Sequence, residues 1–97
     1  MRTRYKKYED WGLTKRQVLD AYEFLNSGLS ELIKHDLISI LNENLPAAVS
    51  EYVILALLEQ KGYNTLEKMG LTYAKSDFYG YKRKGLWLVA NYLGYIN

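Results

Sequence analysis

Residues 76–84 read Ser76-Asp77-Phe78-Tyr79-Gly80-Tyr81-Lys82-Arg83-Lys84, close to the end of a chain of 97 residues. Ser76 is a favourable N-cap, so the spacing predicts a helix from Asp77 to about Tyr95. At about 100° per residue, one side of this helix is apolar and should face the core: Phe78, Tyr81, Gly85, Val89, Tyr92 and Ile96. The other side carries Tyr79, Gly80, Arg83, Lys84, Trp87 and Asn91, with Lys82 at the flank.

Three further helices are expected before this one. Thr14 and Gln17 form a capping box that starts the first, and residues 26–28 end it. Ser30 caps the second, which ends at residues 42–44. The third has Pro46 at its first helical position and ends near Gln60. Its apolar residues cover most of its circumference, so we expect it to be the central helix, closed by Gly62 in a left-handed conformation.

A short helix and a turn connect these helices to the last one. Asn64 or Thr65 can cap a helix that reaches Met69, and residues 70–72 form a turn. A short helix, a glycine-containing turn and a helix that opens with basic side chains are typical of a helix-turn-helix. The sequence therefore predicts an all-α, single-domain bundle of about five helices. A basic and aromatic arm occupies residues 1–12, and a helical domain occupies residues 13–97 with its helix-turn-helix at about 62–95.

The composition argues against several classes of function. The chain has no cysteine, so disulfides, thiolate metal sites and cysteine nucleophiles are excluded. Its one histidine, His35, falls on the side of its helix away from the apolar residues, and no glycine-rich phosphate loop is present. We therefore expect no enzymatic activity, no metal site and no cofactor. No signal peptide or membrane-spanning stretch is visible, which favours a cytoplasmic protein without a membrane partner.

Basic residues are concentrated at two places in the chain. Residues 1–8 hold four and no acid, residues 75–84 hold four and the single acid Asp77, and the remainder holds five basic and ten acidic residues. Such patches most commonly bind phosphate backbones, so we expect double-stranded DNA as the partner. The residues expected to bind it are Lys75, Ser76, Tyr79, Gly80, Lys82, Arg83 and Lys84, together with Arg2, Arg4, Lys6 and Lys7 of the arm. The alternative is that these charges only form solvated surface.

Each residue type in this set has a physical reason to bind nucleic acid. Arg83 can form two hydrogen bonds to a guanine edge or a phosphate, and the lysines attract phosphates. Gly80 costs about 1 kcal/mol in a helix relative to alanine, which fits a position where a side chain would block close approach. Trp87 admits three interpretations: stacking on Arg83, a contact with a partner or second copy, or packing against the segment that holds Trp11.

Residues 76–84 also resemble a known family. The late-transcription regulators of temperate phages (the RinA/ArpU-like group) carry a similar Asp-Phe-Tyr-Gly-Tyr-Arg-Arg-like segment before an apolar closing helix, which here begins at residues 85–89. Residues 62–65 stand where that group has a short helix, and residues 8–14 resemble its acidic and aromatic lead-in. The resemblance implies a sigma-region-4-like helix-turn-helix that binds a promoter and works with host RNA polymerase.

The leading hypothesis is therefore a sequence-specific DNA-binding regulator of phage transcription, present in the host cytoplasm, for which a homodimer is left open. Two alternatives belong to other classes. One is a DNA-packaging subunit of the small-terminase type, which would form a ring. The other is a protein-interaction module that binds a host protein through Tyr79, Trp87 and Tyr95.

Overall fold

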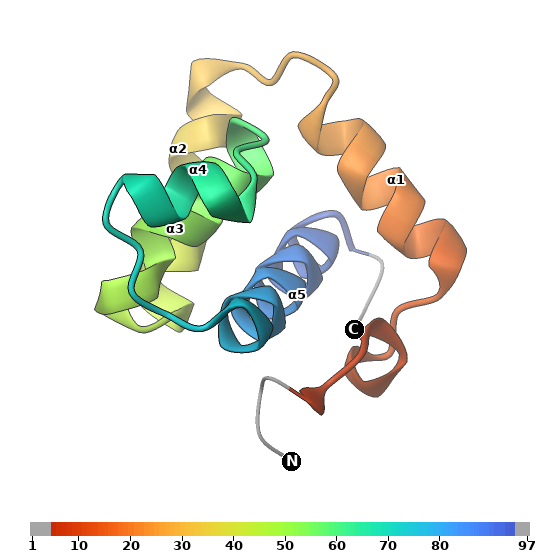
Figure 1. The fold of residues 1–97 in the computed structure, drawn as a ribbon. Coiled ribbons are helices and arrows are strands. Elements are labelled where there is room, and N and C mark those ends of the chain that lie inside the picture. The colour runs from red at the N-terminus through yellow and green to blue at the C-terminus, as the bar shows by residue number, and fades with distance from the viewer. Residues whose placement is uncertain (1–4, 95–97) are drawn as a thin grey trace.

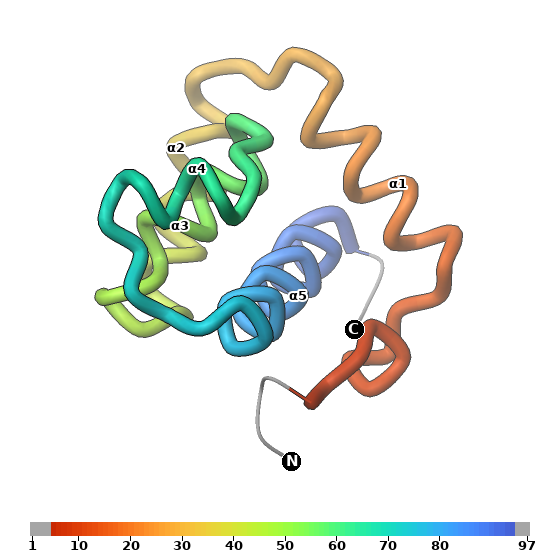
Figure 2. Tube along the Cα trace, in the orientation of Figure 1, coloured from red at the N-terminus to blue at the C-terminus, as the bar shows by residue number. Residues whose placement is uncertain are grey.

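The computed structural model describes residues 5–94, and every regular element in that range is helical. The elements are the 3-10 helix η2 and five α-helices: η2 (Tyr8–Trp11), α1 (Lys15–Leu25), α2 (Glu31–Asn44), α3 (Ala47–Leu58), α4 (Tyr63–Lys68) and α5 (Lys75–Tyr92). The prediction of an all-α domain of about five helices is confirmed. Figures 1 and 2 show α5 in the middle of the molecule, with α1 on one side and α2, α3 and α4 on the other.

The first two predicted helix starts are confirmed because their caps are local. The Thr14 hydroxyl accepts from the Gln17 backbone N–H at 3.1 Å, and the Gln17 side-chain oxygen accepts from the Thr14 N–H at 2.9 Å. The Ser30 hydroxyl accepts from the Ile33 N–H at 3.3 Å. Each bond satisfies a backbone donor that the first helical turn leaves without a partner.

Two boundaries around α3 differ from the prediction. Pro46 lies just outside the helix as its N-cap residue, with extended backbone, rather than at the first helical position. The helix ends at Leu58, and Gln60, not Gly62, adopts the left-handed conformation, with φ of 58°. The Lys61 N–H bonds the Leu55 carbonyl across this turn at 3.3 Å. Gly62 is extended and becomes the N-cap of α4.

The prediction that Ser76 caps the last helix is wrong. α5 begins two residues earlier than expected, at Lys75, with Ala74 as its N-cap residue and without a side-chain capping bond. Leu71 and Phe78 are buried on either side of this helix start. We infer that their burial fixes the start of α5, since no hydroxyl cap does. Ser76 is an exposed residue of the first turn.

The most enclosed helix is α5, which packs against α1, α2, α3 and η2. The predicted core positions Phe78, Gly85 and Val89 are buried, but so are others around the helix: Gly80, Leu86, Leu88 and Ala90. The prediction that Gly80 lies on the outward face is therefore wrong. The prediction assumed that this helix has one core face. In the structure four elements pack against α5: α2 and α3, and also α1 and η2.

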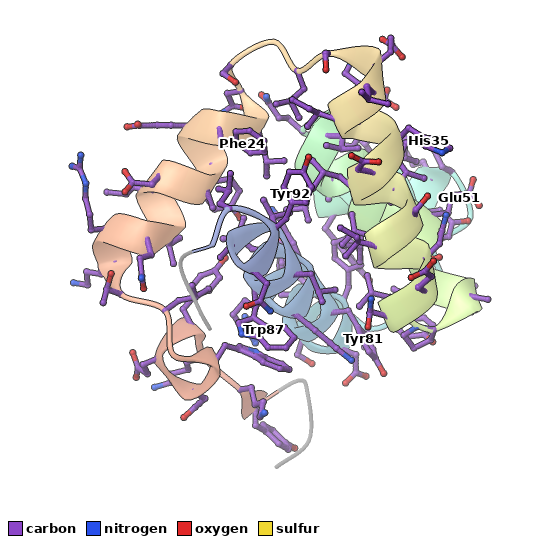
Figure 3. All side chains as sticks on the ribbon, turned by 180° about the vertical axis from the view of Figure 1, so that it is seen from behind. Phe24, His35, Glu51, Tyr81, Trp87 and Tyr92 are labelled. Atoms are coloured by element: carbon purple, nitrogen blue, oxygen red, sulfur yellow. The ribbon has the colours of Figure 1, made fainter. Side chains whose placement is uncertain are left out.

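Aromatic residues hold α1 and α5 together at the far end of α5. The rings of Phe24 and Tyr92 lie 6.4 Å apart, and both are labelled in Figure 3. Tyr92 remains 38% exposed, so it forms the edge of the core rather than part of its interior. The same figure shows His35 on the outer side of α2, where it is exposed as the sequence predicted.

Between residues 5 and 94 no helix combines the length and the apolar character needed to cross a membrane.

Candidate nucleic-acid interface

The segment expected to be a helix-turn-helix consists of α4, residues 69–74 and the start of α5. Leu66 and Leu71 are buried beneath it, and the Tyr63 hydroxyl donates to the Tyr73 carbonyl at 2.8 Å. The Tyr63 ring lies 5.9 Å from the Phe78 ring, so α4 is anchored on the first turn of α5. The connection has six residues, 69–74, between Lys68 and Lys75, whereas a helix-turn-helix ordinarily uses three or four.

One face of the first turns of α5 carries two lysines on either side of a tyrosine. The ammonium nitrogens of Lys75 and Lys82 lie 6.0 and 5.8 Å from the centre of the Tyr79 ring. The Lys82 ammonium also lies 6.0 Å from the Tyr22 ring of α1. These distances are at the outer limit of a cation–π contact. The arrangement places two positive charges beside an aromatic ring that is itself only half-buried.

The environment of Lys82 affects its protonation. Burial lowers the pKa of the Lys82 ammonium, because the charged form loses hydration when its stem packs among aromatic rings. Burial also raises the pKa of the neighbouring Tyr22 phenol, and the Tyr8 hydroxyl, 3.4 Å away, raises it further. Tyr22 and Tyr8 were not among the residues expected at the interface. The sequence positions of Tyr8 and Tyr22 could not connect them to Lys82, because these three residues lie on different elements, η2, α1 and α5, that meet only in the fold.

Arg83 does not lie on an open surface. Its Nε donates a hydrogen bond to the Lys6 backbone carbonyl at 2.7 Å, and the side chain is half-buried. The sequence identified Arg83 as a base-reading residue on an exposed face. In the structure the residue links α5 to the segment before η2, 77 positions away in the chain.

The structure decides among the three interpretations of Trp87. Its ring lies 5.0 Å from the Trp11 ring, so Trp87 packs against the N-terminal segment. The Lys6 ammonium lies 4.0 Å from the centre of the Trp11 ring. Figure 3 shows Trp87 on the side of α5 that faces this segment. Residues 5–11, which we call the N-terminal segment, therefore lie against Trp87 and Arg83, on the side of α5 that was expected to face away from the core.

The remaining predicted site residues fall into three groups. Lys75 and Ser76 are exposed on the first turn of α5, and Lys84 is half-exposed. Lys6 and Lys7 lie in the N-terminal segment, where the Lys7 backbone N–H donates to Asp10 Oδ2 at 2.8 Å. Arg2 and Arg4 lie outside the described residues.

A further question for this region is whether its side chains could bind a metal ion. Among residues 5–94, no three histidine, aspartate or glutamate side chains come together in a way that could hold a metal ion. What the region offers is positive charge, aromatic rings and a serine hydroxyl. The chain matches no protein-family model, and the searches of curated proteins and of solved structures found no match to it either.

Proposed function

We propose that this protein is a DNA-binding regulator of phage transcription whose basic end contacts double-stranded DNA. The observation that carries the proposal is the hydrogen bond between Arg83 and Lys6. It places Lys6 beside Arg83, so the segment that carries Lys6 and Lys7 lies against the helix that carries Lys75, Lys82 and Lys84. Ten of the eleven acidic residues, all except Asp77, lie between residues 9 and 67. Basic residues from two segments that meet in the fold favour a phosphate backbone as the ligand.

The proposal gives the residues different tasks. Lys75, Lys82 and Lys84 neutralise phosphates, because a lysine acts as a point charge without a preferred base. Ser76 and Tyr79 extend from the first turns of α5 toward base edges. Gly80 has no direct part, because it is buried. The regulatory role, including work with host RNA polymerase, rests on the resemblance of residues 76–84 to the phage regulators.

The role of the lysines is tested by the salt dependence of binding. Lys75→Ala and Lys84→Ala should each weaken binding to all DNA sequences alike and reduce the slope of log K against log salt by about 1. Lys61→Ala is the matched control, because Lys61 is an exposed lysine in the loop before α4. If Lys61→Ala reduces the slope as much as Lys75→Ala and Lys84→Ala do, the proposal that DNA binds at the start of α5 is wrong.

The role of Arg83 is tested by selecting preferred sites from random DNA at physiological salt, with the wild type and with Arg83→Ala. If Arg83 contacted a guanine directly, Arg83→Ala would abolish the preference for guanine at one base position and weaken binding to the preferred site by about 1–3 kcal/mol. We expect instead a uniform loss across positions, since Arg83 holds the N-terminal segment. A palindromic motif would indicate a homodimer. Absence of binding even at low salt would overturn the proposed function.

A further inference from the structure

A groove lies between the N-terminal segment and the start of α1, separate from the lysine–tyrosine face of α5. Its volume is about 1050 Å³. Most of its lining is apolar and comes from five residues: Tyr5, Tyr8, Leu13, Val18 and Leu19. Leu19 is 57% exposed although α1 buries its other face through Ala21 and Leu25, and Tyr5 is 56% exposed. This combination leaves an apolar surface open to solvent.

The charges at the groove have one dominant sign. Lys7, Lys15 and Arg83 line it, and Glu9 is the single acid among the described residues that do so. An occupant that complements this groove is apolar on one side and acidic at its flanks. A DNA backbone matches the basic residues but would leave the apolar lining uncovered, so DNA alone does not complement this groove.

We propose that this groove is a docking site for an acidic amphipathic helix of a partner protein. The volume of about 1050 Å³ is slightly above the roughly 300–1,000 Å³ of small-molecule pockets. A strand is disfavoured because the described residues contain no sheet edge to which it could be added. A helix meets the requirements, because apolar side chains at positions i, i+3, i+4 and i+7 fill a groove while acidic residues flank them. The proposal does not depend on DNA binding.

The test uses a random library of helical peptides of about 16 residues, roughly four turns, displayed on phage and selected on the full chain. We expect enriched peptides to combine apolar residues at helical spacing with an excess of Asp and Glu. Leu19→Asp and Lys15→Glu should each weaken binding of these peptides at least about tenfold. Both variants should fold, because Leu19 is exposed and an acidic residue is favourable at the start of α1.

Two control variants make the same changes of side chain elsewhere. Leu32→Asp replaces a leucine of α2 that is 73% exposed, and Lys61→Glu reverses an exposed lysine; both should leave peptide binding unchanged. The proposal is overturned if no peptide is enriched, if basic peptides are enriched, or if the controls lose as much affinity as the groove variants. A concentration-dependent dimer that Leu19→Asp abolishes would also overturn it, by making a second copy the occupant.

Discussion

At Gly85 the backbone of α5 passes close to α3. A Cβ atom placed there would lie 2.8 Å from Val53 Cγ1 and 3.0 Å from Leu57 Cδ1, closer than side-chain carbons normally approach. Gly85→Ala should therefore lower the free energy of unfolding by about 1–2 kcal/mol. Overpacking costs typically 1–3 kcal/mol, and two contacts this short place Gly85→Ala in the upper part of that range, while the better helix propensity of alanine recovers about 1 kcal/mol. Denaturant unfolding followed by circular dichroism measures the change.

The matched control is Gly62→Ala. A Cβ at position 62 has no heavy atom within 4 Å, and the φ of −79° is accessible to any residue. Its effect should stay within about 0.5 kcal/mol. Equal stability of Gly85→Ala and the wild type would contradict the close approach of α3 and α5.

Lys82 gives a second prediction for a single residue, and its sign follows from the pKa. Burial lowers the pKa of the ammonium from its ordinary value of 10.5, so the folded state binds this proton less tightly than the unfolded state does. The charge of Lys82 therefore destabilises the fold at neutral pH. This destabilisation decreases as the pH rises above the lowered pKa of the folded state, and it is gone above 10.5, where the unfolded state has also lost the proton.

Lys82→Met retains an unbranched, flexible side chain that is one atom shorter, and it removes the charge. We expect a higher Tm than that of the wild type at pH 7, and a smaller difference near pH 10.5, measured by thermal unfolding across this range. Lys61→Met, at an exposed position, should show no such gain. A lower Tm for Lys82→Met at pH 7 would mean that the contacts with Tyr79 and Tyr22 outweigh the cost of burying the charge.

Among the helices, α1 has the strongest local start signal. Thr14→Ala removes the hydroxyl that accepts from the Gln17 N–H and should lower the free energy of unfolding by about 1 kcal/mol. Thr72→Ala is the control, because Thr72 is exposed in the turn before α5. Chemical denaturation of the two variants compares them directly. The capping interpretation fails if Thr72→Ala proves as destabilising as Thr14→Ala.

Local signals explain which elements could be predicted from sequence. The starts of α1 and α2 were predicted because Thr14 and Ser30 bond to backbone groups three residues away. The start of α5 was not, since Ser76 is a good cap that the structure does not use and buried Leu71 and Phe78 flank the actual start. A capping residue shows where a helix can begin, and packing decides whether it does.

The candidate site was harder to predict, because its geometry depends on contacts between distant segments. Helical spacing correctly placed Phe78 and Val89 in the core. It could not show that Lys6 and Trp11 return to cover Arg83 and Trp87, because periodicity within one helix contains no information about a segment 77 positions away.

For the molecule as a whole, the Cα radius of gyration is 12.7 Å, which agrees with the value of about 12.5 Å for a compact domain of this length. The N-terminal segment contributes to this compactness through the Lys6–Arg83 hydrogen bond and the Trp11–Trp87 contact. Because η2 also packs on α5, the segment should unfold together with the five helices in one cooperative transition.

This expectation can be measured with two probes. Trp11 and Trp87 are the only tryptophans in the chain and lie 5.0 Å apart, so tryptophan fluorescence reports on the N-terminal segment. Far-ultraviolet circular dichroism reports on the helices. The denaturant midpoints of the two probes should coincide in the wild type. In Trp11→Phe, which retains a smaller ring, they should still coincide at a lower denaturant concentration. A fluorescence transition that precedes the loss of helix would show that the segment opens by itself. Arg83 would then lose its bond to Lys6 while α5 is still folded, and a direct contact between Arg83 and a base would again be compatible with the fold.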